Sequence, residues 1–308
     1  MSTPPKPDAN APPSQPAPLI PSDRPSYPAS GRAETGRFFR PSIPPPPEPT
    51  PIEAIGDKLI GLLNHLGRIA IIFVQALRAL LRRPLELRAI IYQMESLGVR
   101  SVGIASITAV FIGMVMAVQF AFGLQKFGGM EYTGRVVGLS FARELAPTLT
   151  AVIVGGRIGS GMAAEVGSMA VTEQIDAINA LGADPIKKLV VPRLVAAVIV
   201  MPVLSIFALV LGFSGAMAVT SSQFNVPAGF FLRTSLESVL LADFMSGVCK
   251  CPFFGVIIAL VGCYFGLITT GGTEGVGRST TRSVVVISIA ILIADFFLTK
   301  IFLVLWPT

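Results

Sequence analysis

Residues 102–122 read VGIASITAVFIGMVMAVQFAF, a run of 21 residues without a single charge. Because about 20 apolar residues in an α-helix cross the hydrocarbon core of a bilayer, this run predicts a transmembrane helix. Four further runs of the same kind follow, at about 139–158, 189–219, 244–268 and 284–305. The sequence therefore predicts an all-α membrane protein with five spans, whose backbone polar groups are satisfied within each helix.

The composition of the whole chain agrees with this fold class. Of its 308 residues, 52% are hydrophobic and only 14% are charged, whereas a soluble domain carries about a quarter charged residues. The net charge of +6 does not indicate a nucleic-acid partner, because the basic residues lie between the apolar runs rather than in one patch. Cys249, Cys251 and Cys263 share one apolar run, far from the single histidine His65, so the sequence predicts no metal site.

Residues 1–51 have a different character. They hold 17 of the 25 prolines and no apolar core of the length that a signal peptide needs. This composition predicts a disordered arm with polyproline II stretches, serving as a tether or, on a weaker signal, as a docking motif. The remainder, 52–308, is expected to form one membrane domain.

Residues 52–83 show apolar side chains at three- and four-residue steps, interrupted by basic residues such as Arg68 and Arg78. This pattern predicts a helix in the membrane interface rather than a span. Pro84 should end it, and 85–98 is expected to form a second short interfacial piece. Lys and Arg residues are most frequent before the first span and between spans two and three, which predicts a cytoplasmic N-terminus and a C-terminus on the opposite side.

The connection between the second and third runs is the most strongly patterned polar segment. Small residues at 155–161 allow close helix contacts. Thr172, Glu173 and Gln174 can begin a short helix with acid in its first turn, and 182–185 should end it. A cytoplasmic helix anchored by spans on both sides suits the transmission of force from a soluble motor. The alternative is an ordinary interfacial helix. The periodicity of the apolar residues does not distinguish a force-transmitting helix from an interfacial one.

This segment resembles the signature of the MlaE (YrbE-type) permease family of MCE-associated ABC lipid transporters. The matching motifs are an arginine-glycine run at 156–161, Ala164-Glu165-Val166-Gly167, Thr172-Glu173-Gln174-Ile175-Asp176-Ala177 and Gly182-Ala183-Asp184-Pro185. Further matches lie at 111–115, 143–147, 191–193, 277–285 and 295–299, in order along about 52–306.

The resemblance implies a homodimeric permease domain at 52–308 that binds two copies of a separate ABC ATPase. In Gram-negative relatives the complex also holds a small STAS-domain protein and a periplasmic MCE-domain ring, and it moves phospholipid between the inner membrane and that ring. A Gram-negative inner membrane is accordingly the expected location, with a periplasmic C-terminus. The chain has no phosphate-binding loop of the Gly-x-x-x-x-Gly-Lys-Ser/Thr type, so ATP is expected on the partner, with no cofactor and no catalytic residue here.

Two charged residues, Arg143 and Glu144, stand near the start of the second run. Charged side chains at membrane depth are costly and usually face a cavity or one another. The predicted orientation places this pair toward the outer leaflet, where it could meet a lipid headgroup. The predicted lipid site comprises Arg143, Glu144, Leu145, Gln119 and Phe122. The alternative is that the charged pair only braces the helix against a neighbouring loop.

The resemblance also assigns residues to coupling with the ATPase. They are Glu165, Thr172, Glu173, Gln174, Asp176, Asp184 and Arg193. In the fifth run, Asp295 is expected to bond a neighbouring span and Lys300 to reach the interface.

Two other classes of protein fit these patterns less well. A secondary transporter driven by ions or protons would show internal repeats and broken helices meeting at the midplane, whereas no two-fold repeat is visible and five spans do not divide evenly. A scaffold that only anchors other proteins would need neither the patterned helix at 172–185 nor the charged pair in the second span.

Overall fold

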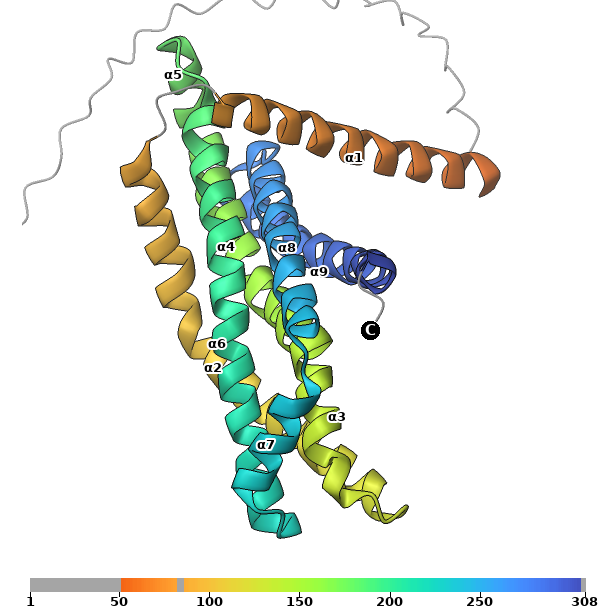
Figure 1. Cartoon of the computed structure of the whole chain (residues 1–308). Helices are drawn as coiled ribbons and strands as arrows, with labels where there is room; N and C mark the ends of the chain where they lie inside the picture. Colours follow the sequence, from red (N-terminus) through yellow and green to blue (C-terminus); the bar gives the residue numbers. More distant parts are fainter. Residues whose placement is uncertain (1–50, 82–85, 306–308) are drawn as a thin grey trace, which may run out of the picture. The chain divides into compact units, whose positions relative to one another are not determined.

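The computed structural model describes residues 51–81 and 86–305 (Figure 1). Within these ranges the chain is helical and contains no β-strand, which confirms the all-α prediction. The predicted proline-rich arm lies, except for Pro51, outside the described residues.

Among the residues that the structure describes, five segments are long and apolar enough to cross a membrane, as predicted. The first is α2 (Leu87–Gln125), the fourth is α8 (Leu241–Leu267) and the fifth is α9 (Gly272–Leu305). The second span joins η1 (Met130–Tyr132), α3 (Thr133–Ser140), η2 (Phe141–Leu149) and α4 (Thr150–Val171). The third joins η3 (Ile186–Val190) and α6 (Val191–Phe224). Three helices are not spans: α1 (Pro51–Leu81), α5 (Gln174–Ala180) and α7 (Ala228–Ser238).

The helices extend beyond the apolar runs. The expectation of a separate interfacial piece at 85–98 is wrong, because α2 begins at Leu87 and continues without interruption through the first span. In the same way α4 continues to Val171, and α9 already begins at Gly272. These stretches contain no proline, so a helix that starts in lipid can continue into the headgroup region and the solvent beyond it.

The contact between α2 and α6 depends on small residues. Every fourth residue of α2 from Ala105 to Ala121 is small and buried. At the centre of this stripe, a Cβ atom on Gly113 would lie 1.9 Å from the carbonyl oxygen of Gly212. The two backbones therefore touch, which is how membrane helices gain packing energy without a hydrophobic driving force.

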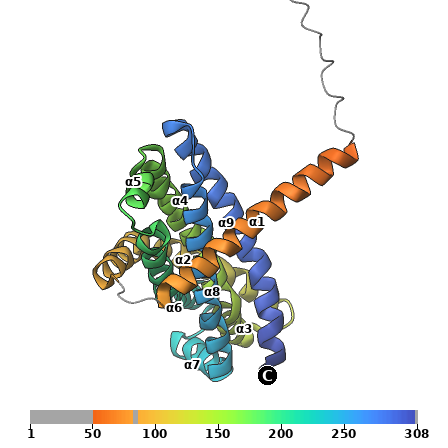
Figure 2. The ribbon, with the colours of Figure 1, turned by 90° about the horizontal axis from the view of Figure 1, so that it is seen from above.

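Glycines also set the contacts of α4. A Cβ on Gly155 would lie 2.6 Å from Ile258 of α8, and one on Gly159 would lie 2.0 Å from Ile287 of α9. These contacts confirm that part of the glycine-rich stretch at 155–161 serves close helix packing. Viewed along the bundle, α4, α6 and α8 lie between α2 and α9 (Figure 2).

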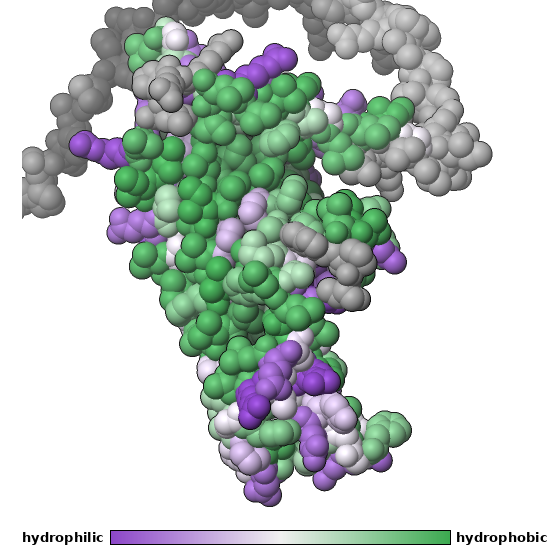
Figure 3. Space-filling view, viewed as in Figure 1, coloured by the Kyte–Doolittle hydropathy of each residue, from purple (hydrophilic) through white to green (hydrophobic). Residues whose placement is uncertain are grey.

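The two ends of the bundle differ. Helix α5 projects at one end, where α1 runs across the bundle, and α3 and α7 lie at the other end (Figure 1). Apolar residues cover most of the visible face, and hydrophilic ones gather toward the α3 and α7 end (Figure 3). His65 of α1 and Tyr264 of α8 are hydrogen-bonded at 2.5 Å between Nδ1 and the hydroxyl oxygen, so α1 is attached to the fourth span.

The second span bends where it carries its charged pair. Residues 141–149 form a wide π-helical segment with Pro147 inside it. Proline has no backbone N–H to donate, and widened turns of this kind often occur at functional sites. The bend turns Arg143 and Glu144 toward α8 and α9.

Candidate functional site

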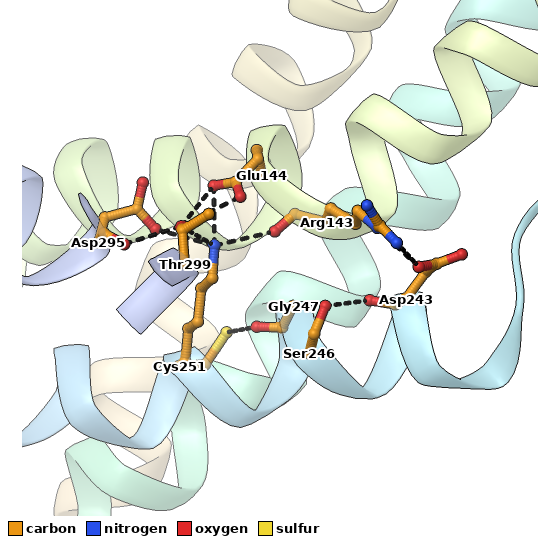
Figure 4. Close-up of polar contacts among 9 residues, drawn as sticks. Arg143, Glu144, Asp243, Ser246, Gly247, Cys251, Asp295 and Thr299 are labelled. Carbon is orange, nitrogen blue, oxygen red and sulfur yellow. Dashed lines mark hydrogen bonds and ion pairs between the residues drawn. The ribbon is translucent and has the colours of Figure 1, made fainter. Parts of the chain in front are cut away.

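A buried lysine is the centre of the polar contacts inside the bundle. Lys250 of α8, whose side chain is 2% exposed, donates hydrogen bonds to Glu144 Oε2 at 2.8 Å and to Thr299 Oγ1 at 2.7 Å. Its ammonium also lies 3.2 Å from Asp295 Oδ1. Figure 4 shows Glu144, Asp295 and Thr299 converging from the second and fifth spans. The predicted bond of Asp295 to a neighbouring span is confirmed, and this contact joins three spans.

Arg143 makes a separate ion pair beside this cluster. Its Nε donates to Asp243 Oδ1 at 2.6 Å, and its terminal nitrogen also contacts that oxygen. Asp243 is the third residue of α8, and its other oxygen accepts a hydrogen bond from the backbone N–H of Leu240 at 3.0 Å. The carboxylate therefore caps α8 at its positive end and fixes the arginine next to it.

The lysine cluster and the arginine pair line one cavity of about 270 Å³. The cavity lies between η2, the start of α8 and the end of α9, and its wall includes Ser140, Ser246, Phe302 and Leu303. The side chains of Glu144 and Arg143 are 39% and 26% exposed, whereas Lys250 and Asp243 are almost fully buried. A ligand in this cavity thus meets one carboxylate and one guanidinium side by side, and it can engage a polar group that carries both signs of charge.

The structure brings together two of the five residues predicted for the lipid site. Leu145 instead packs in an apolar cluster around Phe141. Gln119 lines a different, open hollow between α2 and α6. Phe122 is exposed, with the Lys126 ammonium 5.0 Å from its ring centroid. All five assignments stay predictions. Gln119 and Phe122 were assigned because their position late in the first run predicts a depth similar to that of the charged pair, and depth does not specify the direction of a side chain.

Sequence reasoning missed Lys250, Asp243 and Thr299 as partners of the charged pair. A signal for Lys250 was available, because it is the single charged residue between Asp243 and Glu274. A charge inside an apolar run is rare and usually functional. Thr299 gave no such signal, since a threonine hydroxyl is common in membrane helices and commonly bonds its own backbone.

The patterned segment between spans two and three folds as a projecting hairpin. Glu173 adopts a left-handed conformation with φ of 58°, α5 follows from Gln174, and Gly182 ends the hairpin tip with φ of 75°. The predicted short helix and its stop signal are confirmed. Leu181, at the tip, is 86% exposed, and an apolar side chain presented in this way is typical of a protein contact.

The residues predicted to couple to an ATPase fall into two groups. Glu173, Asp176 and Asp184 lie on the projecting hairpin, and Thr172 accepts a hydrogen bond from the Gln174 amide at 3.0 Å. These assignments stay predictions.

Glu165 and Arg193 instead pair with each other at 2.9 Å, between α4 and α6 at the base of the hairpin. Arg193 is 4% exposed and also donates to the Leu189 carbonyl at 2.6 Å. The pair therefore fixes the two helices that carry α5, and it is the hairpin tip that offers a free surface.

Comparison with known proteins finds permeases, both by a family model and by individual relatives. Residues 90–301 match the family model described as Permease MlaE. The probable ABC transporter permease protein slr1045 of Synechocystis is 44% identical over 220 residues, which cover 71% of this chain and 84% of that protein. A probable ABC transporter permease protein of Rickettsia bellii is 37% identical over 249 residues, covering 81% and 96% of the two chains.

A plant relative matches over a similar length. Protein TRIGALACTOSYLDIACYLGLYCEROL 1, chloroplastic, of Arabidopsis thaliana is 35% identical over 234 residues, covering 76% of this chain and 67% of that protein. With five membrane spans and a family match over most of its length, the chain belongs to the MlaE permease family and is an integral membrane permease of an ABC transporter.

Proposed function

We propose that this permease moves phospholipid through the membrane, with the headgroup received in the cavity between Arg143 and Glu144. The observation that supports this most directly is the exposure of one guanidinium and one carboxylate side by side within otherwise apolar spans. A headgroup that carries a phosphate and an ammonium matches both. The guanidinium would bind the phosphate through charge-assisted hydrogen bonds, and Glu144 would accept from the ammonium.

The apolar surface beside the cavity suits the acyl chains. Phe296, Phe297 and Ile301 of α9 are exposed next to the cavity-lining residues Thr299 and Phe302. Exposing acyl chains to water would cost about 0.8 kcal/mol for each CH₂ group, so this apolar surface would keep the chains out of water while the headgroup is bound. The name of the Arabidopsis relative refers to a glycolipid, which supports a lipid as the class of cargo.

An ABC permease requires an ATPase partner, and the proposed docking site is the α5 hairpin. ATP would be bound and hydrolysed on that partner, and the present chain would have no catalytic role and hold no cofactor. The rigid base formed by Glu165 and Arg193 would carry a movement of α5 into both α4 and α6. Helix α4 continues directly into η2, which holds Arg143 and Glu144, so the same movement would reach the lipid cavity.

The remaining partners are proposed from the open surfaces and the charge distribution. A second copy of the chain would cover α9, which is the least buried of the five spans. Basic residues such as Arg88 and Lys187 lie at the α5 end, which favours a cytoplasmic location for that end in an inner membrane. A periplasmic MCE-domain protein would then meet the α3 and α7 end, and a STAS-domain protein would join the ATPase.

One observation favours a second candidate, a carrier driven by protons. Lys250, Glu144 and Asp295 form an ionisable cluster around a buried lysine inside the bundle, as proton-coupled carriers often have. Co-reconstitution of the chain with its ATPase and an acceptor protein separates the two functions. Transfer of labelled phospholipid that requires ATP supports the proposal, and transfer that follows an imposed proton gradient without ATP contradicts it.

A further inference from the structure

A second cavity lies in the half of the bundle nearer α5. It has a volume of about 780 Å³, is formed by α2, α4 and the start of α9, and shares no lining residue with the first cavity. The polar part of its wall consists of Gln93, Ser96, Arg100, Arg157, Ser160, Glu165 and Thr280. Of these wall residues, the function proposed above uses Glu165 alone, for its pair with Arg193.

The available charge in this cavity is positive. Arg157 donates one hydrogen bond to Ser101 Oγ at 2.8 Å, which leaves most of its five N–H groups unengaged. Arg100 makes no hydrogen bond or ion pair with any residue that the structure describes. The one carboxylate in the wall, Glu165, is paired with Arg193. Two guanidinium groups thus face the space without a counter-ion, and planar guanidinium groups bind phosphate oxygens well.

The position of Arg100 along α2 indicates the depth of the cavity. The 25 residues between Arg100 and Lys126 carry no charge, and at 1.5 Å each they span about 38 Å of helix. The hydrocarbon core is about 30 Å thick. Arg100 therefore lies at the level of the headgroups of the leaflet on the α5 side, and Arg157, which bonds the adjacent Ser101, lies close to the same level.

We propose that this cavity binds the phosphate of a phospholipid from the leaflet on the α5 side. The inference rests on the proposed function and adds a second headgroup site to it. Arg157 follows Arg143 by 14 residues of nearly continuous helix, so the two sites lie roughly 20 Å apart across the bilayer. A lipid that passed from one site to the other would cross most of the hydrocarbon core.

Two arginines would also attract an acidic segment of the ATPase. The distance between the arginines and the α5 hairpin, where the ATPase is proposed to dock, argues against this ligand. Helix α4 continues for 14 residues from Arg157 to Val171 before the hairpin begins, which is about 21 Å. The cavity wall extends along α4 to Glu165, but a protein docked on α5 would stay at about that distance from Arg157. The apolar side chains of Ile104, Ile107 and Phe111, exposed on α2 toward the bilayer centre, instead continue the cavity into a surface for acyl chains.

The test places a photoreactive amino acid at Ser96 in the full chain, bound to its ATPase in phosphatidylethanolamine vesicles that contain radiolabelled phosphatidylethanolamine. A second protein carries the photoreactive residue at Leu303, in the wall of the first cavity. We expect labelled lipid at both positions. The double variant R100Q/R157Q should lower labelling at Ser96 about tenfold, as expected when charge-assisted hydrogen bonds are lost, and leave labelling at Leu303 unchanged.

Two glycines give a matched control for the shape of the site. A Cβ on Gly161, in the cavity wall, or on Gly103 of α2 would meet no atom within 4 Å, so a side chain at either position begins in open space. Gly161→Phe should fill the cavity and abolish labelling at Ser96, and Gly103→Phe should not change it.

Three results would overturn the inference. They are labelling at Ser96 that is unchanged in R100Q/R157Q, crosslinks from Ser96 to the ATPase in place of lipid, and binding of radiolabelled inorganic phosphate that R100Q/R157Q abolishes while no lipid labels Ser96, which would indicate a free anion as the ligand. Labelling at Ser96 without labelling at Leu303 would contradict the first lipid site and support the second.

Discussion

Lys250 of α8 donates a 2.8 Å hydrogen bond to Glu144 of the second span, and both are held against the fifth span by Thr299 and Asp295. The lysine is buried, whereas the glutamate keeps a part of its surface open to the cavity. The lysine therefore holds the glutamate in position, and the glutamate is the residue that a ligand in the cavity can contact. The two residues should respond differently to substitution.

Replacing Lys250 by methionine should damage the fold as well as transport. It would leave Glu144 and Asp295 without their cation in a setting that water reaches poorly, and breaking a buried pair costs about 3–5 kcal/mol. Thermal unfolding of the purified protein should shift clearly downward. Lys300→Met is the matched control, because Lys300 lies on the exposed side of α9 near the Phe296 ring, and it should change neither unfolding nor transport.

Exchanging Glu165 and Arg193 one at a time tests the base of the hairpin. Glu165→Gln leaves Arg193 buried without its carboxylate and should cost about 2 kcal/mol. Arg193→Met leaves Glu165, which is half exposed to solvent, and should cost less. Both should lower the amount of lipid transferred per ATP hydrolysed, and the double variant should be no worse than the more severe single one. Additive losses would mean that each residue has its own contact with the ATPase.

Leu181→Asp tests the hairpin tip as a docking surface. The side chain contacts little within the chain, so unfolding should not change, but recovery of the ATPase with the tagged permease should fall roughly tenfold or more, as for a central interface residue. Leu240→Asp, an exposed leucine at the opposite end, is the control. Equal recovery of the ATPase with Leu181→Asp and the unchanged protein would exclude α5 as the docking site.

Gly113→Val tests the contact between α2 and α6. The added side chain would collide with the Gly212 backbone, and overpacking of this kind costs about 1–3 kcal/mol or more. We expect a lower unfolding temperature and a reduced amount of protein in the membrane. Gly103→Val, at an open position of the same helix, should behave as the unchanged chain does. Similar behaviour of the two variants would contradict the close approach.

The sequence predicted those features that depend on a short stretch of residues alone and not on contacts with distant parts of the chain. An uncharged run such as 102–122 predicts a span because lipid tolerates few alternatives. Glu173 and Gly182 bracket a helix that could be predicted from its start and stop signals. Helix ends in solvent could not be predicted from apolarity, because α2 and α4 continue well past their apolar runs.

The candidate site depended on contacts that the sequence does not contain. Arg143 and Asp243 are 100 residues apart and meet only because η2 bends toward the start of α8. Gln119 was predicted at the depth of the charged pair but faces another hollow, since the direction of a side chain depends on helix rotation. The sequence could therefore predict which charged residues lie within the spans, but it could not predict the residues with which they pair.

The most direct test of the proposed lipid site replaces Leu303, in the wall of the first cavity, by a photoreactive amino acid and measures the phospholipid that crosslinks to it. The chain, co-reconstituted with its ATPase, should be compared with Glu144→Gln and with Glu237→Gln, an exposed glutamate of α7 outside the cavity. We expect labelled phospholipid at Leu303 in the unchanged protein and in Glu237→Gln. We expect about tenfold less in Glu144→Gln, with a parallel loss of ATP-dependent transfer. Labelling and transfer that are unchanged in Glu144→Gln would contradict the proposed lipid site.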